Sequence, residues 1–259
     1  MSQWVTLFQK EMLENWRNKK WIWVPLVFIL IAAMDPVTNY YMPQIIDTVG
    51  GLPEGASIQL PEYTPAEVVM MSLGQLSSLG VLVIVLMSMG AISGERKSGI
   101  AEMILVKPVS HLNYITAKWA ALLVLVWTSL FLGMLASWYY INILFGSLAF
   151  MDLLLIVFFY GLWLTLVISL SIFYNSLVRA PGLVAACTIL TIMLMSLITR
   201  IFEKYLAWSP NRMSSHIHDM LISDKISADL LLTGLITIVI CILLLAASTA
   251  VFRTRELAE

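Results

Sequence analysis

Few side chains in this sequence have the type and spacing that catalysis or metal binding requires. His216 and His218 are two residues apart, as two metal ligands can be, but no further ligand accompanies them, and a surface loop is the preferred interpretation. Asp35 and Gln75 lie in long apolar stretches, where polar groups are costly. Asp35 either lines a polar path or, as we prefer, meets water near the outer surface. We therefore assign no catalytic, cofactor-binding or metal-binding residue.

The composition is that of a protein embedded in a lipid bilayer. Of the 259 residues, 60% are hydrophobic and 12% are charged, whereas about a quarter are charged in soluble domains. The mean hydropathy is +0.89. The net charge of −1 argues against nucleic acid as a partner. Cys187 and Cys241 lie in apolar stretches, and no disulfide is expected between them.

Six apolar stretches are long enough to cross a hydrocarbon core of about 30 Å at about 1.5 Å per residue. They cover residues 21–41, 68–92, 115–140, 153–175, 183–201 and 230–252. Pro36 is expected to kink or end the first helix. In residues 1–20, apolar residues recur near helical spacing among charged ones, as in an interfacial helix. Residues 202–229 are predicted to form an outer segment. The predicted fold class is all-α integral membrane, with one transmembrane domain over residues 1–259.

The basic residues predict the orientation of these spans. Eleven of the fifteen fall on the side of the two chain ends, and the outer segments 42–67 and 142–152 contain none. Because basic loops stay in the cytoplasm, both termini are expected there, in a multi-pass protein of the cell membrane.

The stretch between the second and third predicted spans reads GERKSGIAEMILVKPVSHLNYITAK. It is rich in basic residues and therefore predicted to be cytoplasmic. Ser98 is placed to cap a short helix, with Ile100, Met103 and Ile104 on one face and Pro108 at its end. Such a helix is either an ordinary turn within a loop or a docking surface for another protein.

This stretch resembles the cytoplasmic segment after the second span in permeases of the ABC-transporter type-2 family. The family pattern is an acidic residue, a glycine, an apolar pair, Pro-Val-Ser and a later lysine. The matching residues are Glu95, Gly99, Ile104, Leu105, Pro108, Val109, Ser110 and Lys118. Two positions differ, because Ile100 replaces the usual threonine and His111 replaces the usual arginine.

The resemblance implies a fold and a function for the whole chain. Residues 1–20 would be an elbow helix, residues 94–111 a docking segment with a coupling helix, and residues 202–229 a re-entrant or cap segment. The chain would be the permease subunit of an ATP-driven exporter of hydrophobic or amphipathic cargo in a bacterial plasma membrane, and not an enzyme. A second permease chain, identical or different, and membrane lipids would be its other partners.

ATP hydrolysis would belong to a separate ABC ATP-binding subunit that carries ATP and magnesium. The sequence supports this division, because it lacks the phosphate-binding loop GxxxxGK[ST], the zinc motif HExxH and the nucleophile motif GxSxG. Coupling to that subunit would involve Glu95, Gly99, Ile100, Met103, Ile104 and Pro108. Glu95 is expected to pair with a basic group of the subunit or with Arg17.

The outer half of the second span is unusually polar. Ser72, Gln75 and Ser78 follow one another near helical spacing and form a candidate cargo path. Gly74 and Ser78 have instead the four-residue spacing of closely packed helices. This face therefore either lines a cavity between two permease chains or packs against a neighbouring helix, and the amide of Gln75 favours the cavity.

Two other functions are compatible with the sequence. A membrane-embedded lipid-modifying enzyme would need polar residues that converge within the spans. A sensory or anchoring subunit would recruit a cytoplasmic partner without transport. Co-purification with an ATPase whose turnover depends on this chain would separate the permease from both.

Overall fold

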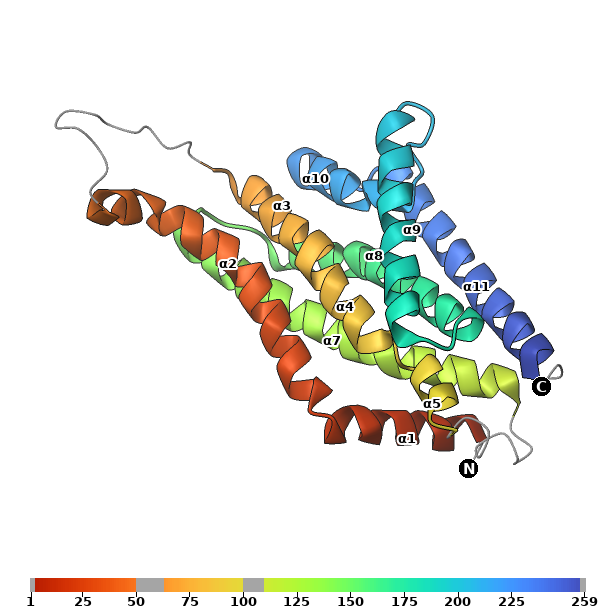
Figure 1. Cartoon of the computed structure of the whole chain (residues 1–259). Helices are drawn as coiled ribbons and strands as arrows, with labels where there is room; N and C mark the ends of the chain where they lie inside the picture. Colours follow the sequence, from red (N-terminus) through yellow and green to blue (C-terminus); the bar gives the residue numbers. More distant parts are fainter. Residues whose placement is uncertain (1–2, 50–62, 100–109, 257–259) are drawn as a thin grey trace.

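Long helices run side by side, and a shorter helix lies across one end of them (Figure 1). The computed structural model describes residues 3–49, 63–99 and 110–256. The helices are α1 (Gln3–Arg17), α2 (Lys20–Val49), α3 (Pro65–Gln75), α4 (Val81–Ser88), α5 (Ser93–Lys97), α7 (His111–Leu144), α8 (Phe150–Leu177), α9 (Pro181–Ile201), α10 (Met213–Ser223) and α11 (Ala228–Glu256), with a π-helical turn η1 (Leu76–Gly80) and a 3-10 turn η2 (Pro210–Arg212).

In the described part of the chain, six stretches of helix are long and apolar enough to cross a membrane. They are Lys20–Ile46, Pro65–Lys97, His111–Leu144, Phe150–Leu177, Pro181–Ile201 and Ala228–Thr254. Each predicted span lies inside one of them, which confirms the prediction of an all-helical membrane fold. The protein is therefore a multi-pass membrane protein.

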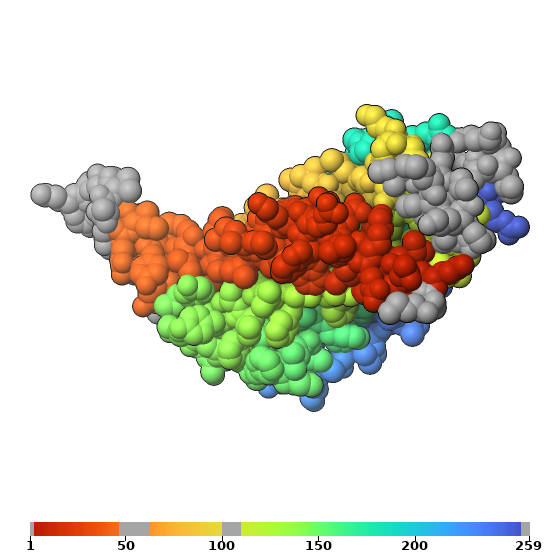
Figure 2. Space-filling view, turned by 90° about the horizontal axis from the view of Figure 1, so that it is seen from below, coloured from red at the N-terminus to blue at the C-terminus, as the bar shows by residue number. Residues whose placement is uncertain are grey.

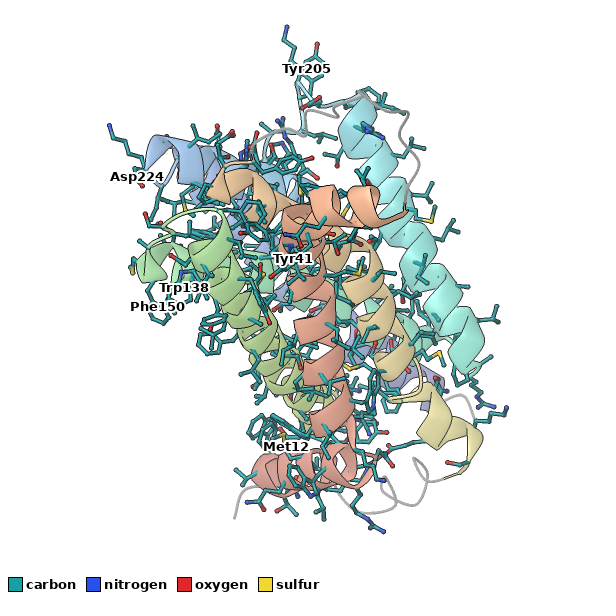
Figure 3. The ribbon with its side chains drawn as sticks, turned by 90° about the vertical axis from the view of Figure 1, so that its left-hand side faces the viewer. Met12, Tyr41, Trp138, Phe150, Tyr205 and Asp224 are labelled. Atoms are coloured by element: carbon teal, nitrogen blue, oxygen red, sulfur yellow. The ribbon has the colours of Figure 1, made fainter. Side chains whose placement is uncertain are left out.

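The two ends of the bundle differ in what they contain. Helix α1, α5 and both chain ends lie at one end, and α10 lies at the other (Figure 1). Figure 3 shows Met12 of α1 at the first end, and Tyr41, Trp138 and Phe150 toward the opposite end. The rings of Trp138 and Phe150 meet edge to face, with their centroids 5.8 Å apart. The end that carries α1 is called the α1 end below.

Helix α8 occupies the centre of the bundle and packs against α4, α7, α9 and α11. It is apolar around its whole circumference, so its burial on several sides is favourable. Helices α1 and α2 lie along α7, as the view from below shows (Figure 2). Gly133 of α7 permits this approach, because a β-carbon there would lie 2.9 Å from the carbonyl oxygen of Phe28.

Helix α2 does not end at Pro36 but continues to Val49. Proline has no N–H group, so the Ala32 carbonyl loses its usual helical donor. The Ser72 hydroxyl of α3 donates to that carbonyl at 2.9 Å, and Ser137 of α7 lies 2.9 Å from the same hydroxyl. The second span thus supplies a hydrogen bond that the first span lacks at Pro36. The helix is not ended there, and whether Pro36 kinks it stays a prediction.

Replacing Ser72 with alanine should lower the free energy of unfolding by about 1–3 kcal/mol, because the Ala32 carbonyl and the Ser137 hydroxyl lose a buried partner. In a Pro36→Ala background the cost should be smaller, since residue 36 then has an N–H for Ala32. Thermal unfolding in detergent micelles measures both. Ser78→Ala is the control, because the exposed Ser78 hydroxyl bonds only carbonyls of its own span. Equal costs with and without Pro36 would contradict this account.

Candidate functional site

Asn175 of α8 forms hydrogen bonds to the backbone on both sides of the break between α4 and α5. Its side-chain oxygen accepts from the backbone N–H groups of Ile92 and Ser93 at 3.2 and 3.0 Å. Its side-chain nitrogen donates to the carbonyls of Ser88 and Ser171 at 3.0 and 2.9 Å. The side chain is fully buried and uses two donors and two acceptor sites, so its orientation is fixed by its partners.

Glu95 links the short helix α5 to two other helices. One carboxylate oxygen lies 2.6 Å from Lys10 Nζ of α1 and 2.9 Å from Lys118 Nζ of α7. The other oxygen accepts from the Tyr114 hydroxyl at 2.5 Å. Glu95 is 8% exposed and Lys118 is 2% exposed. A buried carboxylate needs such partners, because an isolated buried charge is very costly.

Two acidic residues of α1 extend this charge network. Glu11 lies 2.8 Å from Lys118 and 2.9 Å from Lys10, and Glu14 lies 3.0 Å from Lys10. Burial favours the neutral amine of Lys10, but Glu95 and Glu11 outweigh this effect and hold the pKa of Lys10 above its usual range. Lys10 therefore stays charged at neutral pH.

The acidic residues of the network lie close enough to suggest a metal site. One oxygen from each of Glu11, Glu14 and Glu95 falls within 4.8 Å of the others. The ammonium groups of Lys10 and Lys118 contact oxygens of these carboxylates and offset two of their three negative charges. The arrangement is thus a network of ion pairs that joins α1, α5 and α7.

Arg96 connects α5 to two further helices. Its guanidinium donates to the Ser176 carbonyl of α8 at 3.3 Å and lies 5.6 Å from the centre of the Phe252 ring of α11. Phe252 also stacks on Tyr114, with ring centroids 5.6 Å apart. Together with Glu95 and Asn175, these contacts place α5 at a junction of α1, α7, α8 and α11, which we call the α5 junction.

Gly99 ends the described part of the predicted docking segment. It has a φ of +75°, in the left-handed region that favours glycine. Its N–H donates to the Arg96 carbonyl at 3.3 Å, directly after α5. Ile100, Met103, Ile104 and Pro108 lie outside the described residues, so the coupling helix stays a prediction. Glu95 has its ion-pair partners in Lys10 and Lys118, whereas the sequence suggested Arg17 or another protein.

The structure does not bring the three candidate cargo-path residues to one surface. Ser72 is fully buried against α2 and α7, and Ser78 is exposed. Gln75 is half-buried, and its side-chain nitrogen lies 3.4 Å from a carboxylate oxygen of Asp35. At Gly74, beside this face, a β-carbon would meet nothing within 4 Å among the described residues. A cargo path therefore stays a prediction, and Gln75 and Ser78 are its accessible members.

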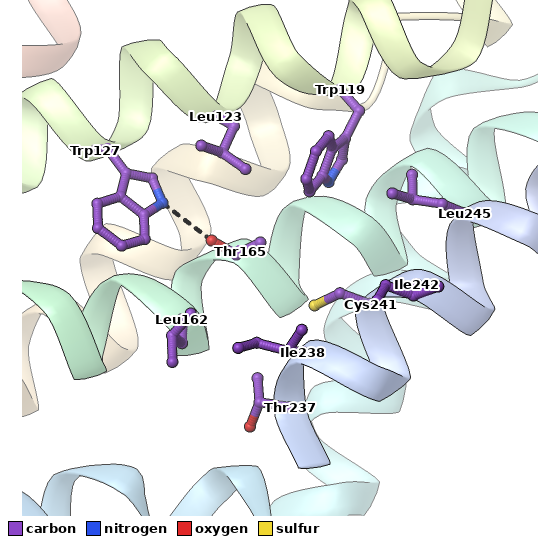
Figure 4. A pocket seen from close by; sticks show the side chains of 10 residues that line it. All are labelled: Trp119, Leu123, Trp127, Leu162, Thr165, Thr237, Ile238, Cys241, Ile242 and Leu245. Carbon is purple, nitrogen blue, oxygen red and sulfur yellow. Dashed lines mark hydrogen bonds between the residues drawn. The ribbon is translucent and has the colours of Figure 1, made fainter. Parts of the chain in front are cut away.

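An apolar cavity of about 230 Å³ lies among α7, α8 and α11 (Figure 4). Trp127 donates its indole N–H to the Thr165 hydroxyl at 3.0 Å, and Trp119 donates to the Ser169 hydroxyl at 3.0 Å. Both indole N–H groups are thus satisfied within the protein, and none of the described residues that line the cavity is charged. This cavity is separate from the candidate cargo path.

At the other end of the bundle, η2 and α10 form part of the predicted outer segment, and α10 packs on α3 and α8. The interpretation of His216 and His218 as part of a surface loop is wrong, because both lie in α10. His216 is buried, with Nε2 2.8 Å from the Ala207 carbonyl oxygen. Among the described residues, no group of three metal-ligating side chains includes His216 or His218. Whether this segment re-enters the membrane stays a prediction.

Removing either member of the Glu95–Lys118 pair should be costly, because the remaining charge is left buried. We expect Glu95→Gln and Lys118→Met each to lower the free energy of unfolding by about 3–5 kcal/mol, and the double variant to cost less than their sum. Thermal unfolding in detergent measures all three. Glu14→Gln is the control, because Glu14 is 46% exposed and surface pairs contribute about 0–1 kcal/mol. Additive costs would show that the two charges are not coupled.

Comparison with known proteins confirms the resemblance seen in the sequence. Residues 5–257 match the family described as "ABC-2 family transporter protein". The chain is 30% identical over 242 residues to the "Uncharacterized transmembrane protein YxlG" of Bacillus subtilis (strain 168), and the match covers 93% of each chain. This protein is therefore a membrane-spanning member of the ABC-2 transporter family.

Proposed function

We propose that the chain is the permease subunit of an ATP-driven exporter, coupled to a separate ABC ATP-binding subunit and paired with a second permease chain. Membership of the ABC-2 family supports a role in transport. The observation that carries the coupling proposal is the α5 junction, because the segment expected to meet the ATP-binding subunit leaves directly from it.

The α5 junction provides a physical route for coupling. A displacement of α5 acts on α1 and α7 through Glu95, on α8 through Asn175, and on α11 through Arg96. These contacts are buried ion pairs, hydrogen bonds and ring contacts, which resist stretching more than a solvated loop does. Binding of ATP by the partner would thus move several spans together, as rigid-body transitions between two states require.

The proposed orientation follows from the charge distribution. Arg17, Lys19 and Lys20 stand at the join of α1 and α2, at the α1 end. Because basic residues remain in the cytoplasm, we place this end, the docking segment and both termini there. Hydrophobic or amphipathic cargo would leave the membrane or the cytoplasm toward the α10 side. Gln75 and Ser78 would face the cargo between two permease chains.

Co-purification of the full chain with its ATP-binding subunit, followed by measurement of ATP turnover, tests this function. Gly99→Ala should lower the stimulated turnover severalfold, because a side chain at positive φ costs about 1–2 kcal/mol and re-aims the docking segment. Gly94→Ala is the matched control, since a β-carbon there meets nothing within 4 Å among the described residues. Turnover that does not depend on the chain at all would refute the permease role.

A second pair of variants tests the cargo path. Gln75→Leu should leave the assembled complex intact but change which compounds stimulate ATP turnover, because the polar contact with Asp35 is lost. Gly74→Leu should instead lower the yield of assembled complex, because it adds bulk to the exposed face of α3. If Gln75→Leu leaves the cargo profile unchanged, the face with Gln75 and Ser78 packs against a neighbouring helix and does not line a cargo path.

A further inference from the structure

A cavity of about 330 Å³ lies where α1 meets the bundle. Its walls come from α1, the start of α2, the end of α4, α7 and the start of α9. Its charged lining residues are Glu11, Glu14, Lys20 and Lys118, and its apolar wall includes Leu86, Met87 and Leu122. Unlike the cavity in Figure 4, it combines charged and apolar walls.

Lys20 differs from the other lysines of this region in its partners. Lys10 and Lys118 each contact carboxylates within 3.0 Å. The Nζ atom of Lys20 donates to the Met87 carbonyl at 3.2 Å, and no carboxylate of the described residues lies within 4.0 Å of it. A half-buried ammonium group with only a neutral acceptor is incompletely compensated. An anion bound in the cavity would complete its coordination.

Glu14 supplies the opposite charge on the same cavity. It is 46% exposed, and among the described residues its one ammonium contact is Lys10 at 3.0 Å. A carboxylate has about four acceptor sites, so Glu14 can accept from a further cation. Glu11 and Lys118, which also line the cavity, pair with each other at 2.8 Å. Lys20 and Glu14 are therefore the cation and the anion that can contact a ligand, which is the charge pattern complementary to a zwitterion.

The apolar wall of the cavity and its position relative to the bilayer indicate that the ligand also has an apolar part. Met87 and Leu122 are buried in its wall, and Leu86 is 49% exposed beside them. Lys20 begins the first span, directly before Trp21, so the cavity lies at the surface of the bilayer. A ligand here meets charged groups on one side and hydrocarbon on the other.

We infer that this cavity binds a zwitterionic phospholipid with a primary-amine headgroup, taken from the membrane leaflet at the α1 end. The phosphate binds Lys20, the ammonium group binds Glu14, and the start of the acyl chains covers Leu86 and Met87. The lipid would lie between α1, which belongs to the α5 junction, and the end of α4, which precedes α5 in the chain. This inference does not depend on transport or on an ATP-binding partner.

Native mass spectrometry of the purified full chain, titrated with phosphatidylethanolamine or phosphatidylglycerol, tests the inference. Phosphatidylethanolamine should be retained more strongly. Lys20→Gln should weaken its binding about tenfold, as expected for the loss of one charge-assisted hydrogen bond. Lys19→Gln is the matched control, because Lys19 is the preceding residue, is exposed and does not line the cavity.

Glu14→Gln should remove the preference for phosphatidylethanolamine while binding of phosphatidylglycerol is retained. Equal losses in Lys19→Gln and Lys20→Gln would overturn the inference, because they would indicate attraction to surface charge alone. Displacement of the lipid by inorganic phosphate would also overturn it, in favour of a site for free phosphate. Since the assay needs no ATP turnover, its failure would leave the proposed transport function untouched.

Discussion

The arrangement of the α1 end depends on one buried carboxylate. Glu95 belongs to a helix of only five residues, which has too few hydrogen bonds to be stable alone. Its charge is compensated by Lys10 and Lys118, so α1 and α7 must both be in place before α5 can bury it. The same requirement explains why Lys118 can lie almost fully buried in a span. Helices α1 and α7 are thus joined through a segment that could not fold by itself.

Asn175 satisfies backbone groups that would otherwise be unpaired at the break between α4 and α5, close to Glu95. A helix that breaks inside a membrane protein exposes backbone N–H and carbonyl groups that water cannot reach. The single amide of Asn175 satisfies two N–H groups and one carbonyl at this break, and a second carbonyl of its own helix. The central helix α8 therefore both fills the core and fixes where the second span ends. The position of α5 relative to the bundle follows from this contact.

Much of the fold could be predicted from the sequence, because spans are set by long apolar stretches whatever their neighbours are. The family could be recognised from the sequence for a similar reason, since Gly99 and the residues after it form a local motif. The partners of Glu95 were not accessible, because Lys10 and Lys118 come close only after α1 packs along α7. The sequence left open whether Pro36 kinks or ends the first helix, because the Ser72 hydroxyl reaches the Ala32 carbonyl only in the folded bundle. Asn175 did leave a signal, as an amide at the end of an apolar stretch, where an unpartnered polar group would be costly.

The hydrogen bond between Ser72 and the Ala32 carbonyl has a consequence for biogenesis. Spans enter a bilayer in the order of synthesis, and the first span arrives with a carbonyl that its own helix cannot satisfy. Its donor is on the second span, so the stable unit of insertion is the helical hairpin of the two spans, not the first span alone. Pro36 does not divide α2, but it makes α2 depend on α3, the helix that is synthesised next, for a backbone hydrogen bond.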